Sequence, residues 1–282
     1  MISILMSTYN GAAYIAEQLD SIVAQSVQDW ELIVRDDGSA DGTQEILREY
    51  ERQDARIRVV EDTERRGAMR GFEWLLERYG AGEYVAFADQ DDVWLPDKLR
   101  VCMETMRQSE QQYEKDTPIV VHTDLVVVDS TLLIVAKSFW EYTFIKPDVL
   151  NRRAEYLAIC NSVTGCTMLM NQAARSVSLP FGEKALMHDS AIVISTMLNH
   201  GKVVPVYVQT MLYRQHGDNV AGAFAYKWAI PLREKYINAR RQYEAYHPEV
   251  FANVLCFLYW KVRCFLEERL WLCGIAERRR NG

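Results

Sequence analysis

The chain has 282 residues, of which 49% are hydrophobic and 25% charged, so it can bury a large core as one domain or as one domain with an appendage. Its net charge of −7 is uneven: residues 227–282 carry 11 Lys and Arg against 6 Asp and Glu, a net +5, which leaves −12 for residues 1–226. An acidic main part with a basic tail argues against nucleic acid as the main partner, because a polyanion needs a broad basic face.

The six cysteines lack the C-x-x-C spacing of common metal and redox motifs, and no secretory signal precedes them. We therefore expect reduced thiols and a cytoplasmic location. No apolar run approaches the roughly 20 residues that a membrane-spanning helix needs.

Short apolar strands and amphipathic helices alternate through the first 88 residues. We expect strands at 2–6, 30–35, 57–60 and 84–88, separated by helices at 15–25, 43–50 and 68–79. This alternation is typical of a parallel sheet with helices on both faces, which binds ligands at the carboxyl ends of its strands. Polar sequences follow three of the strands, at 7–10, 36–37 and 89–92.

The stretch YVAFADQDDVW, residues 84–94, is the centre of the predicted site. Its strand ends in three carboxylates, Asp89, Asp91 and Asp92, whose mutual repulsion a cation or a basic group must offset. Because Asp89 and Asp91 are two residues apart, an extended chain would point both the same way, toward a hard divalent ion that also holds a phosphate. A solvated acidic turn is the alternative.

The loop after the first strand, residues 7–11, favours neither of two common nucleotide motifs. It lacks G-x-G-x-x-G, which weakens a dinucleotide interpretation, and it lacks the G-x-x-x-x-G-K-S of a P-loop ATPase. Acids at the sheet edge, together with a metal, instead suit a nucleotide bound through its base, ribose and diphosphate. The acidic pair at 36–37 could equally form a turn, because Asp37-Gly38-Ser39 is a good turn sequence.

Beyond Pro96 the pattern is less regular. The expected elements are a helix to about 113, a strand at 119–128, an irregular segment at 131–151, a helix at 153–160, a strand at 164–170, helices at 172–178 and 192–198, and a strand pair at 202–209. The tail is separate, with a basic helix at 226–246 and a second segment at 248–280 that is apolar over more than one face.

Six motifs, in order along the chain, resemble family 2 of the inverting nucleotide-sugar glycosyltransferases, which have the GT-A fold. They are STYNG at 7–11, DDGSADGT at 36–43, RRGAMRGF at 65–72, DQDDVW at 89–94, HDS at 188–190 and YRQHGDN at 213–219. The fourth and sixth motifs are most similar to the rhamnosyltransferase-like branch that builds bacterial surface polysaccharides. The resemblance implies an α/β fold with a mainly parallel sheet, a GT-A domain at 1–225 and a helical extension at 226–282.

The resemblance also implies roles for individual residues. Those expected to bind the nucleotide-sugar donor are Ser7, Tyr9, Asp36, Asp37, Arg70, Asp89, Gln90 and Arg214. Tyr9 and one of the two acids at 36–37 would hold the base and ribose, Asp89 would take the ribose, and Arg70 would approach the phosphates.

Two further roles are chemical. Asp91 and His216 would hold Mn²⁺ or Mg²⁺, which neutralises charge on the departing diphosphate. Asp189 would be the general base that takes the proton from the acceptor hydroxyl, and one base without a second carboxylate nucleophile implies single displacement with inversion. The family's Glu-Asp pair is His188-Asp189 here, which leaves the role of His188 open, and Glu183 is a lesser candidate base. A plain helix N-cap is the structural alternative for Asp189.

The expected activity is metal-dependent transfer of a sugar to a hydroxyl of a polysaccharide or a lipid-linked oligosaccharide. The first candidate for the sugar is L-rhamnose, with dTDP-rhamnose as its donor. A UDP-sugar donor, a sugar-phosphate nucleotidyltransferase and a noncatalytic nucleotide-sugar-binding protein remain alternatives. A nucleotidyltransferase would need a glycine-rich loop with a basic residue after the first strand, which residues 7–11 lack. The presence of Asp189 in addition to the metal site argues against a noncatalytic protein.

The tail combines basic residues with a group of large apolar side chains. That group comprises Phe257, Leu258, Trp260, Phe265 and Trp271. Such a composition suits a helix lying on a membrane surface, so we expect peripheral contact with the inner face of the plasma membrane. An ordinary pair of packed helices or a homodimer contact is the alternative.

Overall fold

The computed structural model describes residues 1–114, 116–217 and 232–280, and side chains within the last range from 236 to 267. One mixed sheet has the strand order β3-β2-β1-β4-β8-β6-β9-β5, with β7 paired to β6. The strands are β1 (Ile2–Thr8), β2 (Trp30–Asp36), β3 (Ile57–Val60), β4 (Tyr84–Ala88), β5 (Val93–Trp94), β6 (Ile119–Asp129), β7 (Ile134–Ala136), β8 (Met168–Asn171) and β9 (Lys202–Gln215).

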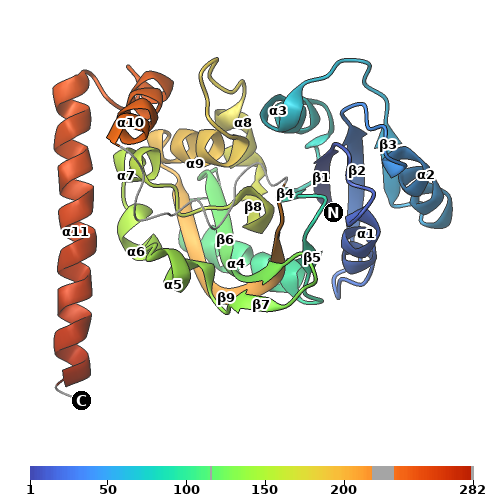
Figure 1. Ribbon diagram of the computed structural model, residues 1–282, viewed down its shortest axis with the longest axis horizontal. Helices are drawn as coiled ribbons and strands as arrows, with labels where there is room; N and C mark the ends of the chain where they lie inside the picture. Colours follow the sequence, from blue (N-terminus) through green and yellow to red (C-terminus); the bar gives the residue numbers. More distant parts are fainter. Residues whose placement is uncertain (115, 218–231, 281–282) are drawn as a thin grey trace.

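Helices cover both faces of this sheet (Figure 1). They are α1 (Ile15–Val23), α2 (Thr43–Gln53), α3 (Gly67–Tyr79), α4 (Lys98–Gln112), α5 (Phe139–Thr143), α6 (Pro147–Leu150), α7 (Ala154–Ile159), α8 (Gln172–Ser178), α9 (His188–Leu198), α10 (Leu232–Tyr246) and α11 (Val254–Arg280). The α/β class and the helical C-terminal part predicted from the sequence are confirmed.

The first four strands form the parallel half of the sheet, as their alternation with helices predicts. Thr8 pairs with Asp36 and Met6 with Ala88, so the carboxyl ends of β1, β2 and β4 meet at one edge. Because side chains alternate across a strand, Leu5 faces the core beneath α3, α7 and α9, whereas Ile4 faces the core beneath α1, α2 and α4. Two cores therefore hold the sheet edge rigid from both sides.

The second half of the chain differs from the prediction in several elements. The strand expected at 164–170 begins only at Met168, as β8, after a short 3-10 turn at Gly165–Thr167. The strand pair expected at 202–209 is one continuous strand, β9, which follows β6 in parallel to Gln215. The pairing shifts register around Asp124, and this irregularity lets the two long strands stay paired. The irregular segment at 131–151 contains β7, α5 and α6, and the helix expected from residue 192 begins four residues earlier, at His188.

The C-terminal helices share the main core. Tyr246, Phe251, Phe257 and Cys264 are buried in the same cluster as residues of α7 and α9. α11 is a single helix of 27 residues that runs along one side of the molecule (Figure 1). The proposed boundary at 225/226 and the start of the helix expected from 226 lie outside the described residues. Within the described part of the chain, no helix has the length and apolar content to cross a bilayer.

Candidate active site

A cavity of about 500 Å³ lies at the carboxyl edge of β1 and β4. Its lining includes seven of the residues that the sequence singled out, namely Ser7, Tyr9, Asp37, Asp89, Gln90, Asp91 and Asp189. The whole lining runs from Ser7 to Tyr213, so segments up to 206 residues apart in the chain converge here. The parallel strands bring their carboxyl ends to this edge.

Gln90 ties the first loop to the acidic turn. Its side-chain oxygen accepts hydrogen bonds from the Thr8 hydroxyl and from the Tyr9 N–H, at 2.9 Å in the second case, and its amide nitrogen donates to the Tyr9 carbonyl. Gly11 allows this approach, because a Cβ there would lie 2.5 Å from the Gln90 oxygen. Gln90 therefore shapes the cavity as well as lining it.

Arg65 is a cavity residue that the sequence reasoning missed. Its guanidinium lies 4.6 Å from the centre of the Tyr9 ring and donates to the Asp37 carbonyl at 3.1 Å. Tyr9 is exposed, so the ring and the guanidinium together form a polar and aromatic rim on the cavity. Arg65 is the first residue of the RRGAMRGF motif, from which the prediction selected Arg70 as the donor contact.

Arg70 is not among the residues that line the cavity, and its approach to the phosphates stays a prediction. Its guanidinium forms an ion pair with Glu73 at 2.5 Å and donates to the carbonyls of Phe181, Gly182 and Glu183. Arg70 therefore anchors the loop that leads to α9. Glu183, the lesser candidate base, is exposed and lies outside the cavity lining.

The acidic pair at the end of β2 has two different uses. Asp36 accepts from the N–H groups of Gly38 and Ser39, so it is a turn former and not a cavity residue, as the turn interpretation allowed. Asp37 lines the cavity and accepts from the Arg66 N–H at 2.7 Å and from Arg35 at 2.6 Å. Burial alone would raise the pKa of Asp37, but these hydrogen bonds outweigh burial and lower it.

Arg214 is also placed differently from the prediction. It is buried outside the cavity lining, where it donates to the carbonyl of Asp91 at 2.8 Å and to that of Ser130 at 2.9 Å, and pairs with Glu17. Its contact with the Asp91 carbonyl supports the acidic turn, and its predicted contact with the donor stays a prediction. Asp218 and Asn219, which complete the YRQHGDN motif, lie outside the described residues.

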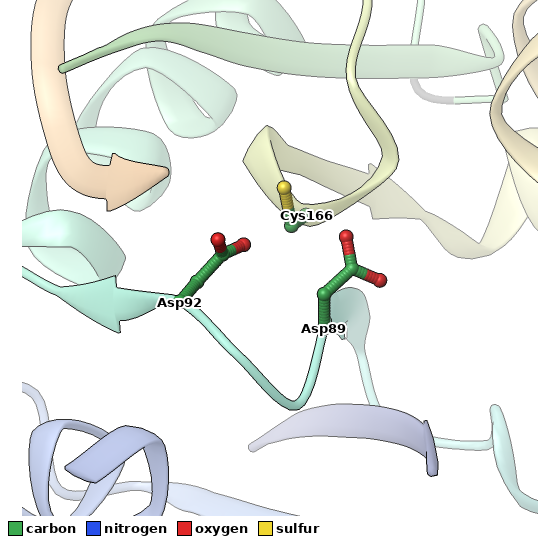
Figure 2. Close-up of side chains that lie close together, drawn as sticks. All are labelled: Asp89, Asp92 and Cys166. Atoms are coloured by element: carbon green, nitrogen blue, oxygen red, sulfur yellow. The ribbon is translucent and has the colours of Figure 1, made fainter. Parts of the chain in front are cut away.

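Three ligand-type side chains form a cluster behind the turn. Figure 2 shows Asp89 and Asp92 on either side of the Cys166 thiol, and potential ligand atoms of the three residues lie within 4.8 Å of one another. Burial, and then the Asp91 charge, raise the pKa values of Asp89 and Asp92. The buried ammonium of Lys98 offsets part of the carboxylate charge. The cluster has the donor atoms of a metal site, although Lys98 already supplies one positive charge near the carboxylates.

Asp91 and His216 form the second arrangement of ligand type. The His216 Nε2 lies 2.8 Å from the Asp91 Oδ2, and the two side chains are 11% and 13% exposed. Two ligand atoms bound at right angles to a metal at 2.1 Å are about 3 Å apart, so this spacing fits a shared divalent ion. Because Asp91 lines the cavity, this pair could hold a metal in contact with a bound nucleotide.

Asp189 is the second residue of α9, and the residue that caps the helix is Met187. The N-cap interpretation of Asp189 is therefore wrong. Its carboxylate accepts from the N–H groups of Ser190 and Gly165 and from the Asn161 side chain, while burial outweighs these contacts and raises its pKa to about 6. A carboxylate with this pKa can accept a proton near neutral pH.

His188 precedes Asp189 and also lines the cavity. Its ring packs against Phe72, with centroids 4.1 Å apart, and burial lowers its pKa to about 3. The imidazole is therefore neutral and a poor base at neutral pH, which leaves Asp189 as the stronger base of the two.

The sequence is similar to that of known glycosyltransferases. The family model described as "Glycosyl transferase family 2" matches residues 3–177. The putative teichuronic acid biosynthesis glycosyltransferase TuaG of Bacillus subtilis is 43% identical over 108 residues, which are 38% of this chain and 42% of TuaG. The dTDP-rhamnosyl transferase RfbG of Shigella flexneri is 34% identical over 108 residues, 36% of each chain. The chain thus aligns with less than half the length of these two relatives.

A third relative matches over nearly its full length. WfaP of Escherichia coli, named UDP-Glc:alpha-D-GlcNAc-diphosphoundecaprenol beta-1,3-glucosyltransferase, is 22% identical over 93% of each chain. Among solved structures, the mannosyltransferase PcManGT of Pyrobaculum calidifontis, in complex with GDP-Man and Mn²⁺, has a TM-score of 0.59 at 19% identity and covers 98% of this chain and 79% of its own. At this identity the structural likeness shows the fold.

Proposed function

The chain belongs to glycosyl transferase family 2 and has the GT-A fold, and we propose that it transfers a sugar with inversion from a nucleotide-sugar donor to an acceptor hydroxyl. One observation carries this proposal: Asp189 lines the same cavity as Asp91, which is paired with His216. A single carboxylate base, together with a pair of side chains that can bind a divalent metal, suits single displacement. The family match favours this activity over the nucleotidyltransferase and noncatalytic alternatives.

The nucleoside part of the donor would lie at the rim formed by Tyr9 and Arg65. Tyr9 offers an aromatic face for a base, and Arg65 is held in place by the Asp37 carbonyl. Asp37 keeps the start of α3 ordered at the cavity wall through its bonds to the N–H groups of Arg66 and Gly67. Asp89 remains the proposed ribose contact, because it follows β4 directly and lines the same cavity as Tyr9 and Arg65.

Asp91 and His216 are the proposed holders of Mn²⁺ or Mg²⁺. A divalent ion supplies charge neutralisation for the departing diphosphate. Arg214 fixes the Asp91 backbone from the buried side, and Gln90 fixes the turn to the first loop. These contacts hold the ligand-type side chains in position before the donor binds, which lowers the cost of organising the site.

Asp189 is the proposed general base. It would remove the proton from the acceptor hydroxyl as that oxygen attacks the anomeric carbon and the bond to the diphosphate breaks. Its N–H contacts from Ser190 and Gly165 orient the carboxylate without neutralising it. The other carboxylates that line the cavity, Asp37, Asp89 and Asp91, have different proposed roles, in the cavity wall, in ribose binding and in metal binding, so we expect one displacement and hence inversion.

We propose dTDP-L-rhamnose as the donor, with a UDP-sugar as the alternative. RfbG, which matches part of this chain, is named a dTDP-rhamnosyl transferase, whereas WfaP is named for UDP-Glc. The acceptor is proposed to be a lipid-linked saccharide in the synthesis of a bacterial surface polysaccharide, because the name of WfaP specifies a diphosphoundecaprenol acceptor.

We further propose that α11 contacts an anionic membrane surface, where a lipid-linked acceptor would be presented. Phe257 and Cys264 face the core, and a second apolar stripe on α11 is between 50% and 78% exposed. The stripe comprises Val254, Leu255, Leu258, Tyr259, Val262, Phe265 and Leu266. The excess of basic residues at 227–282 complements anionic lipid. A second copy of the chain is the competing occupant.

Donor binding tests the function most directly. A thermal-shift panel of dTDP-rhamnose, UDP-glucose, UDP-GlcNAc and GDP-mannose, each with and without Mn²⁺, should show one nucleotide class that raises the melting temperature and does so more strongly with the metal. A ligand that binds only the folded state stabilises it by mass action. No shift with any of these donors would contradict the proposed function.

A further inference from the structure

Part of the cavity wall is apolar and lies beside Asp189. Ala68 and Phe72 are one helical turn apart on α3, and Met187 precedes α9. The Phe72 ring packs against His188, so these side chains form one continuous surface with the start of α9. We name the surface formed by Ala68, Phe72 and Met187 the apolar wall.

His188 closes the apolar wall with two nitrogen atoms that have no hydrogen-bond partner among the described residues. The residue is only 2% exposed, and its ring also lies 5.2 Å from that of Phe87. A neutral imidazole has one N–H to donate and one lone pair to accept, and a buried polar group left unpaired costs free energy. Such a group is unusual in a folded protein unless something outside the chain satisfies it.

Gly165 allows the His188 ring to take this position. A Cβ at Gly165 would lie 2.2 Å from the His188 Nε2, so the ring occupies the space of the missing side chain. The Gly165 N–H also binds the Asp189 carboxylate. His188 and Asp189 therefore converge on one glycine, and all three line the cavity. A group bound to His188 would thus lie close to the proposed base.

We propose that His188 binds a hydroxyl group of the transferred sugar and that the apolar wall receives the methyl group of a 6-deoxyhexose. This inference rests on the proposed function, because it needs a nucleotide-sugar in the cavity. A sugar hydroxyl can both donate and accept, so it can pair with one nitrogen of the imidazole whichever tautomer is present. A methyl group loses no hydrogen bond on entering the apolar wall, whereas the 6-hydroxyl of an ordinary hexose does.

Two variants separate hydrogen bonding from packing. His188→Phe keeps an aromatic ring against Phe72 and removes both nitrogens, whereas His188→Gln returns an amide near the position of Nε2. We expect kcat/KM for dTDP-L-rhamnose to fall about 10- to 100-fold in the first variant and to recover in part in the second. The Kd for dTDP with Mn²⁺, which lacks the sugar, should stay the same in both.

His122 supplies the matched control, because it is a second fully buried histidine with an unpartnered ring nitrogen, and it lies outside the cavity lining. His122→Phe should change the melting temperature without changing the kcat/KM ratio between two donors. Those donors are dTDP-L-rhamnose and the matching dTDP-hexose with a 6-hydroxyl, between which the wild type should favour the first about 10- to 100-fold.

The outcomes assign failure to one hypothesis or the other. If both His188 variants keep the wild-type kcat/KM and donor ratio, His188 is a packing residue and the inference is wrong. If a His188 variant fails to fold, the ratio of kcat/KM between the two donors is measured on the wild type instead. A wild type that prefers the donor with the 6-hydroxyl overturns the role of the apolar wall. If the wild type binds neither dTDP nor another nucleoside diphosphate, the proposed function itself has failed.

Discussion

The imidazole of His216 lies 2.8 Å from the carboxylate of Asp91, although the two residues are 125 positions apart in the chain. β9 carries His216 to this place by running beside β6 to the edge where the turn after β4 begins. Arg214, two residues before His216, donates a hydrogen bond to the Asp91 carbonyl. The pair is therefore held by the end of β9 as a whole rather than by one flexible side chain.

Removing the charge of Asp91 should remove the metal response. Asp91→Asn keeps the size of the side chain but weakens a divalent ion's ligand set, so we expect Mn²⁺ no longer to raise the melting temperature of the nucleotide complex. Asp36→Asn is the control, because Asp36 is a neighbouring acid outside the cavity. Wild-type metal-dependent transfer by Asp91→Asn would show that Asp91 is not a metal ligand.

Replacing the proposed base should affect the reaction step and leave donor binding nearly unchanged. Asp189→Asn is expected to lower kcat about 10²- to 10⁴-fold, because general base catalysis acts in the transition state. Glu183→Gln, at an exposed acid on the preceding loop, should keep wild-type activity. Steady-state kinetics and donor Kd by calorimetry distinguish the two variants, and an equal loss of donor affinity in Asp189→Asn would favour a structural role.

The pH dependence of transfer follows from the same carboxylate. Burial raises the pKa of Asp189 to about 6, and the base must be ionised to accept a proton. The value of kcat/KM should therefore be level above pH 7 and fall about tenfold per pH unit below 6. His188, whose pKa lies near 3, contributes nothing to this limb. A profile that stays level down to pH 4.5 would exclude Asp189 as the group that titrates.

Arg35 should be a major source of stability at neutral pH. It is fully buried and donates to Asp37 at 2.6 Å and to Asp62 at 2.7 Å. Arg35→Met removes this partner from both carboxylates, of which Asp62 keeps Arg66 and Asp37 keeps two backbone N–H groups. The free energy of unfolding at pH 7 should fall by about 3 kcal/mol, the low end of the cost of breaking a buried pair. Thermal unfolding of the wild type and the variant by circular dichroism measures the difference.

The pKa shifts also determine how the stability contributed by Arg35, Asp37 and Asp62 changes with pH. Hydrogen bonds from Arg66 and Arg35 outweigh burial and lower the pKa of Asp62, and Asp37 shifts in the same direction. A carboxyl whose pKa is lowered by folding contributes stability above its unfolded value near 4 and loses it as the pH falls toward the folded pKa. The gap between wild type and Arg35→Met should therefore narrow on acidification. A gap that widens at pH 3 would contradict the assignment.

Liposome flotation tests the exposed stripe on α11. Wild-type protein should float with anionic liposomes at low salt, and the double variant Leu258→Glu, Val262→Glu should not, because it places charge on the stripe. Tyr207→Glu, at an exposed aromatic residue of β9, is the matched control and should still float. Point variants are preferable to truncation, since removing α10 and α11 would also remove buried Phe251 and Phe257 from the core.

A wild-type protein that stays in the soluble fraction while eluting as a dimer would assign the stripe to a second copy. In that case the same double variant should elute as a monomer. The large apolar side chains that the sequence grouped on this helix do not all face the same way. Phe257 is buried, Leu258 and Phe265 are exposed, and the Trp271 side chain lies outside the described residues.

Local patterns in the sequence were sufficient for most elements. The strands at 57–60 and 84–88 and the helix at 172–178 coincide with β3, β4 and α8, because periodicity and flanking turn residues act over a few neighbouring positions. The alternation of these elements was also sufficient to predict that β1 to β4 run parallel, although not their order in the sheet. For the same reason the polar ends of the strands could be assigned to one edge before the structure was known.

Tertiary structure decided which polar side chain at that edge faces the cavity. Asp36 and Asp37 are adjacent, yet one closes a turn and the other lines the site; Arg65 and Arg70 lie in one motif, yet only the first reaches the cavity. A motif states which residue types occur together, but the direction of each side chain depends on the pleat of β2 and on the face that α3 turns to its neighbours. The His216–Asp91 pair and the neutral, buried His188 likewise required β9 and α9 to be placed, because burial and contacts across the sheet arise only when distant segments pack together.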